Sequence, residues 1–301
     1  MLKTTLPTAT FWLVASLCTL SLQAEARDCL PHYSRAAIDS LAVSQFSTEP
    51  GEIDALAMAL SGCLGESDPY LRDDIGYTGL ATLLRSGRVS AATVRSLDQR
   101  LRQQLQSGDD NGYRQPFAAL ALAEVVRADR IDDLLSADER DAIVRIATAY
   151  VRDIRDYRGF SDHEGWRHGV AHGADLLMQL ALNPHLDDQH IPGLVDAALS
   201  QVSAYDNHAY IHGESRRLAR PVLFAAQREV LTADDWTKRF NALTQPDGRP
   251  WQNAYRSESS LARLHNTRTF LLNVYASIAE SENPIFEPLK QSVRGALASL
   301  P

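Results

Sequence analysis

The chain has 301 residues, of which 45% are hydrophobic and 23% are charged, a composition typical of a globular protein with a sizeable buried core. Sixteen Gly and 13 Pro are too few for a collagen-like or low-complexity chain. The 30 basic and 38 acidic side chains leave a net charge of −8, and the densest basic cluster is only Arg216, Arg217 and Arg220, which argues against a nucleic-acid-binding protein.

The N-terminal residues have the pattern of an export signal. A positive start ending at Lys3 is followed by an apolar run over residues 11–22 and by a small-x-small sequence that ends at Ala26. Twelve apolar residues are too few to cross a membrane, which takes about 20. We therefore expect residues 1–26 to be a signal peptide cleaved after Ala26, with the mature chain in the bacterial periplasm and not in a membrane. An uncleaved N-terminal anchor is the alternative.

Two cysteines would remain in the mature chain. Cleavage removes Cys18 and leaves Cys29 and Cys63. Because exported proteins fold in an oxidising compartment, we expect these two residues to form a disulfide that ties the N-terminal segment to the first helices. The alternative is a pair of buried free thiols.

From residue 69 onward, helix signals recur along the chain and strand signals are nearly absent. An apolar residue followed by a capping residue starts a helix at Ser90, Ser136, Asp187 and Thr232. These positions are 46, 51 and 45 residues apart, a period typical of HEAT or armadillo helix pairs. We predict an all-α domain over residues 27–301, built from antiparallel helix pairs in a HEAT-like solenoid or a partial α/α toroid.

The two helices of each pair differ in polarity. The first helices, such as those over residues 117–126, 170–182 and 261–278, are apolar around most of their circumference, whereas the helix that follows Ser90 carries many charges. A helix that is apolar on all sides is buried. We therefore expect the first helices to form an inner layer and the second helices an outer layer.

Polar residues on the predicted inner helices form a row. Glu124, Asp175 and Arg220 each lie 12 residues before a cap, and equivalent positions of successive repeats line up on one surface. The row is predicted to follow a concave inner face, and its other members are Asp74, Tyr77, His168, His172, Arg217, Arg263, His265 and Asn266.

The densest polar segment is residues 165–177. If it is helical throughout, His168, His172 and Asp175 share one face with Gln179, and Trp166 lies on the opposite face. Such a set can bind a divalent metal, perform acid–base chemistry or form a structural network, and these alternatives stay open. No zincin, P-loop, dinucleotide-binding or nucleophile-elbow motif is present.

Two further segments carry polar and aromatic residues of the kind found at binding sites. Tyr157 and Arg158 lie in the segment that leads to the histidine helix, and His208, Tyr210 and Glu214 precede Arg217. Binding groups concentrate on loops held by a rigid scaffold. Capped turns with surface tyrosines are the alternative, and an arginine here could equally form a structural ion pair with Asp175.

The chain resembles the bacterial domain-of-unknown-function family 2785 (DUF2785). The resemblance covers about residues 50–280 and rests on residues 71–77, 114–117 with Glu124, 156–160, 165–177, 208–211, 213–214, 217–221 and 263–266. It implies a helical domain and no activity.

Two functions remain open from the sequence, so that it is undecided whether the protein is an enzyme. The first is a hydrolase or lyase acting on a small polar substrate such as a sugar or peptidoglycan fragment. The second is a HEAT-like module that binds a peptide or protein on its concave face without chemistry. The predicted catalytic residues are Glu124, His168, His172, Asp175 and His265, with His168, His172 and Asp175 as potential metal ligands. The predicted substrate-binding residues are Asp74, Tyr77, Tyr157, Arg158, Trp166, His208, Tyr210, Glu214, Arg217 and Asn266.

Overall fold

A computed structural model describes residues 29–204, 208–244, 251 and 253–301. The predicted signal peptide, residues 1–26, lies outside the described residues. The described chain is predominantly helical, which confirms the all-α class. Its α-helices are α1 (Arg35–Val43), α2 (Ile53–Leu60), α3 (Thr78–Arg85), α4 (Ala91–Gln106), α5 (Arg114–Asp132), α6 (Ala137–Asp153), α7 (Gly169–Leu182), α8 (Ile191–Ser200), α9 (Glu214–Ala226), α10 (Ala233–Thr244), α11 (Glu258–Ile278) and α12 (Glu287–Ala298).

Short elements connect these helices. They are the 3-10 turns η1 (Pro50–Glu52), η2 (Cys63–Gly65), η4 (Asp188–His190) and η6 (Pro284–Phe286), the π-helix η3 (Tyr70–Tyr77), and an antiparallel hairpin of β1 (Phe160–Ser161) and β2 (Gly165–Trp166).

The four predicted cap positions are confirmed. The Ser90 and Ser136 hydroxyls accept the N–H groups of Thr93 and Glu139 at 3.2 and 3.3 Å, and Ser136 forms a full capping box. The Asp187 side chain caps η4, which leads directly into α8, and the Thr232 hydroxyl accepts the Asp235 N–H at 3.2 Å. Each cap satisfies backbone donors that the first turn of a helix cannot satisfy itself.

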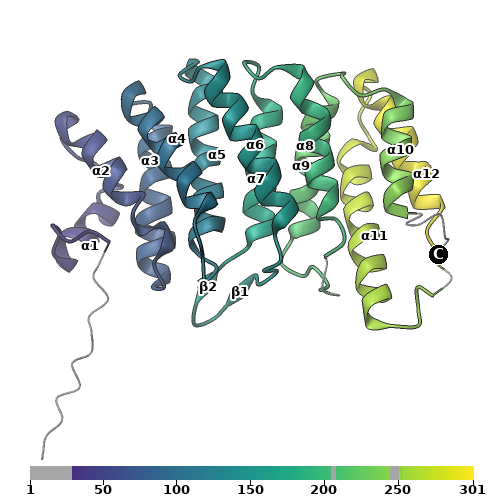
Figure 1. Ribbon diagram of the computed structural model, residues 1–301, viewed down its shortest axis with the longest axis horizontal. Helices are drawn as coiled ribbons and strands as arrows, with labels where there is room; N and C mark the ends of the chain where they lie inside the picture. The colour runs from purple at the N-terminus through teal and green to yellow at the C-terminus, as the bar shows by residue number, and fades with distance from the viewer. Residues whose placement is uncertain (1–28, 205–207, 245–250, 252) are drawn as a thin grey trace, which may run out of the picture.

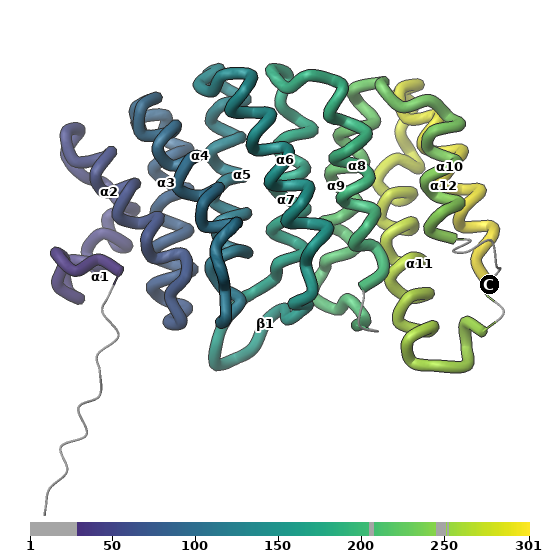
Figure 2. Tube along the Cα trace, in the orientation of Figure 1, coloured from purple at the N-terminus to yellow at the C-terminus, as the bar shows by residue number. Residues whose placement is uncertain are grey.

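The helices follow one another in chain order along the long axis of the molecule. Figure 1 shows this order from α1 at one end to α11 and α12 at the other. The first helix of each pair contacts the first helix of the next, from α3 through α5, α7 and α9 to α11, and α4, α6 and α8 form a second row of contacts. Figure 2 traces the same course, with the C-terminus beside the last pairs.

Two glycines of α7 lie at its contact with α6. A methyl group on Gly173 would lie 2.8 Å from Val151 Cγ2, and a methyl group on Gly169 would lie 3.3 Å from the Tyr150 hydroxyl. Because no side chain separates the two backbones at these points, α7 packs closely against α6.

The segment before α7 differs from the prediction. Gly165 and Trp166 form strand β2 instead of the first turn of a helix, and α7 begins only at Gly169. Gly165 has φ of +69°, a conformation that favours glycine, and Arg72 Nη2 donates a 2.7 Å hydrogen bond to the neighbouring Glu164 carbonyl. The hairpin is therefore stabilised by a side chain 92 residues away, which no local pattern reveals.

The N-terminal segment is covalently tied to the helices. Cys29 and Cys63 form a disulfide with their Cα atoms 5.0 Å apart. In the part of the chain that the structure describes, none of the helices has both the length and the apolar character needed to cross a membrane.

Candidate functional site

A pocket of about 610 Å³ opens between η3, the start of α5 and the β1–β2 hairpin, and we call it the hairpin pocket. Its volume lies within the range usual for small-ligand sites. It contains four of the predicted site residues, Asp74, Tyr77, Trp166 and His172. The complete wall is Pro69, Tyr70, Asp73, Asp74, Tyr77, Thr78, Phe117, Leu120, Phe160, Asp162, Gly165, Trp166 and His172.

The wall has an unusual combination of side chains. Tyr70, Tyr77, Phe117, Phe160 and Trp166 present aromatic rings, and three aspartates lie among them. None of the 13 wall residues described is lysine or arginine. The pocket is therefore both aromatic and acidic.

Two of the three carboxylates face solvent and have no ion-pair partner among the described residues. Asp73 is bound by the buried guanidinium of Arg72, whose Nε lies 2.7 Å from Asp73 Oδ1. Asp74 and Asp162 are exposed and form no salt bridge with any residue that the structure describes. Their negative charges are available to a ligand.

The rings of three wall residues, Trp166, His172 and Phe117, form a continuous series of contacts through His168, which is not part of the wall. Trp166 stacks on His168 with ring centroids 4.6 Å apart, His168 meets His172 edge-on at 5.6 Å, and His172 meets Phe117 edge-on at 5.1 Å. His168 is the N-cap of α7 and has a left-handed backbone conformation, with φ of 56°. That conformation is uncommon for a residue other than glycine and holds the imidazole against Trp166.

Both histidines are neutral at pH 7. Burial, with a smaller contribution from Arg217, lowers the pKa of His168 to about 4, and burial also places the pKa of His172 well below its usual value. His168 Nε2 and His172 Nδ1 have no hydrogen-bond partner among the described residues. The two rings thus offer neutral nitrogens, not positive charges.

The two predicted catalytic carboxylates are held in ion pairs between neighbouring first helices. Glu124 on α5 accepts two hydrogen bonds from Arg85 of α3, one of them 2.8 Å long from Nε to Oε2. Asp175 on α7 pairs with Arg217 of α9, and Arg220 Nη1 lies 3.6 Å from Asp175 Oδ1. Burial raises the pKa of Asp175 despite both arginines. Burial and the nearby Glu124 raise the pKa of Tyr77 to about 12.

The predicted metal ligands do not assemble. Asp175 faces Arg217 and Arg220 instead of the imidazoles, which lie edge to face. Across the described residues there is no group of three or more His, Cys, Asp or Glu side chains that could hold a metal ion. The prediction of a His168–His172–Asp175 metal site is therefore not supported by the geometry.

A second group of predicted residues comes from α11 and from the segments before α7 and α9, and its contacts are structural. The Asn266 side chain on α11 accepts the Tyr210 N–H at 2.8 Å and donates to the His208 carbonyl at 2.9 Å. Tyr157 stacks on His208 with ring centroids 5.8 Å apart. His265 lies 3.3 Å from the Tyr210 carbonyl and is apart from the other predicted catalytic residues, because α9 separates α11 from α7.

The two remaining predicted residues stabilise loops. Glu214 at the start of α9 is buried and accepts the His212 N–H at 2.9 Å, and its Oε1 lies 4.0 Å from His168 Nε2. Arg158 is exposed and forms an ion pair with Asp156, with 2.8 Å between Nε and Oδ1. Neither lines the hairpin pocket.

Sequence reasoning missed several residues of this region. Arg85, the last residue of α3, neutralises Glu124, and Arg72 supports the hairpin. Phe117 and Phe160 supply two of the pocket's rings. Arg85 lies five residues before the Ser90 cap and could have been included by counting backward, but nothing local marks Phe160 as a wall residue.

Comparison with known proteins identifies the family of the chain but assigns it no activity. The chain matches the protein family of unknown function DUF2785 over residues 99–276, more than half of its length, and therefore belongs to that family. The segment over residues 71–77, which also resembled the family, lies outside the matched range. No curated protein and no solved structure matches the chain significantly.

Proposed function

We propose that this DUF2785 protein is a non-catalytic binding module whose hairpin pocket takes a cationic group, the basic side chain of a peptide or protein partner. The observation that carries the proposal is the wall itself, five aromatic rings and three carboxylates without a lysine or arginine among the residues described. The open row of helix pairs supports a HEAT-like solenoid over a closed toroid, and such scaffolds commonly bind peptides.

Aromatic rings attract cations through their negative faces, most strongly when the cation is within about 6 Å of the ring centroid. The protein already uses this interaction beside the pocket. The Arg35 guanidinium lies 4.2 Å from the centroid of Tyr70, a wall residue, and Arg72 lies 5.0 Å from that of Phe117. A ligand guanidinium or ammonium would meet similar rings, with Asp74 and Asp162 to balance its charge.

The arrangement of the predicted catalytic groups favours binding over acid–base chemistry. A general acid or base needs a group free to exchange a proton in the pocket. Glu124 and Asp175 are each paired with arginine, and of the five predicted catalytic residues only His172 reaches the pocket wall. A hydrolase or lyase activity is therefore the less supported of the two predicted functions.

The setting of this function is also proposed. The Cys29–Cys63 disulfide supports folding in an oxidising compartment, and export to the periplasm remains the proposed location. An acidic pocket on a chain of net charge −8 suits a basic partner and does not suit nucleic acid.

The test compares two blocked tripeptides, acetyl-Gly-Arg-Gly-amide and acetyl-Gly-Gln-Gly-amide, by calorimetry and by tryptophan fluorescence. We expect the arginine peptide to bind, to quench the fluorescence of Trp166 and to lose affinity as salt rises, because exposed charges are screened. The glutamine peptide should show no binding.

The decisive variant is Asp74→Asn combined with Asp162→Asn, which should weaken the arginine peptide about fivefold. The matched control, Asp132→Asn combined with Glu282→Gln, changes the net charge equally at two exposed positions away from the pocket. Equal binding of both peptides, or equal effects of the two double variants, would overturn the proposal.

A further inference from the structure

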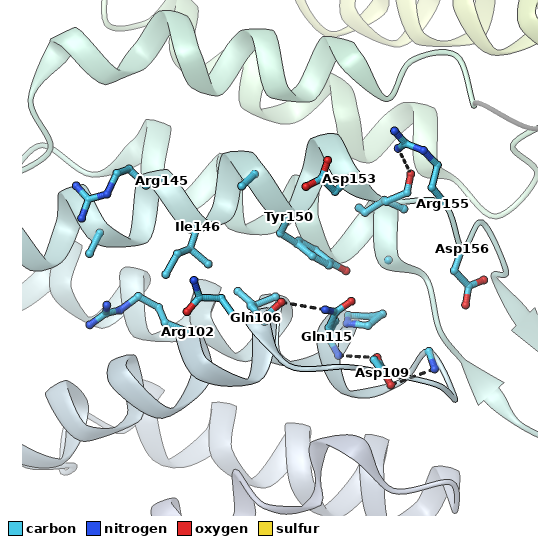
Figure 3. Close-up of a pocket in the computed structure, with 17 residues that line it drawn as sticks. Arg102, Gln106, Asp109, Gln115, Arg145, Ile146, Tyr150, Asp153, Arg155 and Asp156 are labelled. Atoms are coloured by element: carbon cyan, nitrogen blue, oxygen red, sulfur yellow. Dashed lines mark hydrogen bonds between the residues drawn. The ribbon is translucent and has the colours of Figure 1, made fainter.

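A second cavity, of about 690 Å³, lies between α4, the start of α5, α6 and the segment that follows α6 (Figure 3). We call it the α4–α6 cavity. It shares no wall residue with the hairpin pocket and contains none of the residues predicted to be catalytic. Its volume is sufficient for a small ligand.

The cavity has two arginines at one end and two aspartates toward the other. Figure 3 shows Arg145 and Arg102 at the first end, and Asp153 and Asp156 toward the second, where Arg155 also lies and donates to the Arg152 and Ile154 carbonyls. Arg102 is bound by Asp98 at 2.6 Å, and Asp156 is bound by Arg158. Arg145 and Asp153 are exposed and have no ion pair with any residue in the described ranges.

These two unpaired charges lie on one helix, and their separation follows from its geometry. Arg145 and Asp153 are eight residues apart on α6, which corresponds to about 12 Å along the axis at 1.5 Å per residue. A ligand that contacts both side chains would carry a negative and a positive group and would span a distance of this order along α6.

The middle of the cavity suits a chain with apolar and hydrogen-bonding parts. Ile146 and Ala149 lie between Arg145 and Asp153 on α6 and contribute apolar surface. The Tyr150 hydroxyl lies between the two ends (Figure 3) and makes no hydrogen bond to a described residue. Burial, together with Asp109 and Asp156, raises the pKa of Tyr150, so that its phenol stays protonated and can donate to a carbonyl.

We infer that the α4–α6 cavity binds a short zwitterionic peptide of about three residues. Its terminal carboxylate would lie at Arg145 and Arg102, and its terminal ammonium at Asp153. An extended tripeptide spans roughly 10–11 Å, close to the axial separation of Arg145 and Asp153 on α6. The peptide backbone would meet the Tyr150 phenol, and small side chains would contact the apolar wall.

The test measures binding of tri-alanine to the full mature chain by calorimetry, with the N-acetylated and the C-amidated peptides as ligands that lack one terminal charge. We expect tri-alanine to bind and each capped peptide to bind about tenfold more weakly, since each loses one charge-assisted hydrogen bond. Tri-alanine has no basic side chain, and the blocked arginine peptide has no free termini, so a failure here is distinct from a failure at the hairpin pocket.

Substitutions at two exposed residues test where each terminus of the peptide binds. Arg145→Gln should abolish the preference for the free carboxylate, and Asp153→Asn should abolish the preference for the free ammonium. Arg88→Gln and Asp132→Asn are the matched exposed controls and should leave both preferences unchanged. Binding of acetylated and free tri-alanine with equal affinity would reveal a site for anions only and would overturn the inference. So would an Arg145→Gln variant that retains the carboxylate preference.

Discussion

Replacing Arg217 with methionine tests whether Arg217 neutralises the buried carboxylate of Asp175. The structural role that we assign to Asp175 requires this. The Asp175 side chain is only 9% exposed, whereas Arg217 is 40% exposed. Methionine retains most of the apolar stem and removes the charge, so that packing changes little. The buried carboxylate would then keep only Arg220, at 3.6 Å.

The expected loss follows from the surroundings of the pair. Two unit charges about 4 Å apart interact by roughly 4 kcal/mol at an effective dielectric constant of 20. Water screens the exposed guanidinium, and Arg220 retains part of the compensation, so we expect the free energy of unfolding to fall by about 2 kcal/mol at pH 7.5. For a chain of 301 residues that corresponds to a drop in Tm of roughly 3–4 °C.

The loss should depend on pH in a defined direction. Burial already raises the pKa of Asp175 above its value of about 3.9 in the unfolded chain, and removing Arg217 raises it further. At a pH below the folded pKa the carboxyl is protonated in both proteins, and their stabilities should be similar. As pH rises through that pKa, the variant loses the stabilisation by Arg217, and the difference grows until it levels off above the variant's own pKa.

The assay is urea unfolding followed by circular dichroism at pH 4.5, 6 and 7.5. Arg216→Met is the matched control, because Arg216 is an exposed neighbour on the same helix and should change stability by no more than about 0.5 kcal/mol. A loss that is the same at all three pH values would mean that Arg217 acts through packing, and the electrostatic argument would be refuted.

Two further outcomes are expected. The pKa of about 4 for His168 means that this residue binds a proton near pH 6.5 in the unfolded chain but not in the native state, so it alone should lower the free energy of unfolding by up to about 3 kcal/mol between pH 6.5 and 4. His168→Gln should reduce this dependence without removing it, because the pKa of His172 is also lowered, and an NMR titration midpoint of His168 near 6.5 would contradict the prediction. The Cys29–Cys63 bridge spans 34 residues, so Cys29→Ser combined with Cys63→Ser should cost about 4 kcal/mol in the loop-entropy model; dithiothreitol should destabilise the natural chain and leave the double variant unchanged.

Local sequence patterns were sufficient to predict the helix starts and the polarity of the helices. The caps at Ser90, Ser136, Asp187 and Thr232 were predictable because a helix N-terminus is stabilised by residues within one turn of it. The polarity difference between first and second helices was likewise visible along the chain. Because these interactions join residues three or four positions apart, they can be predicted from a single sequence.

The site depended on contacts that no local pattern contains. His168 was predicted as a helical residue, yet it is the cap that precedes α7, because the hairpin places Gly165 and Trp166 in a strand. That hairpin is held by Arg72, 92 residues earlier in the chain. Glu124 and Asp175 were recognised as inner polar residues, but their partners Arg85 and Arg217 come from neighbouring helices and turn candidate acids into ion pairs.

The sequence by itself therefore determined the helical class and the helix caps, since short-range hydrogen bonding and apolar periodicity decide these. The tertiary structure alone decided the chemistry of the pockets. Burial and the charges of adjacent helices set the pKa values of His168 and Asp175, and long-range packing brings aromatic rings from η3, α5 and the hairpin to one cavity. Electrostatic and packing energies depend on distance in space, and the sequence specifies that distance only through the completed fold.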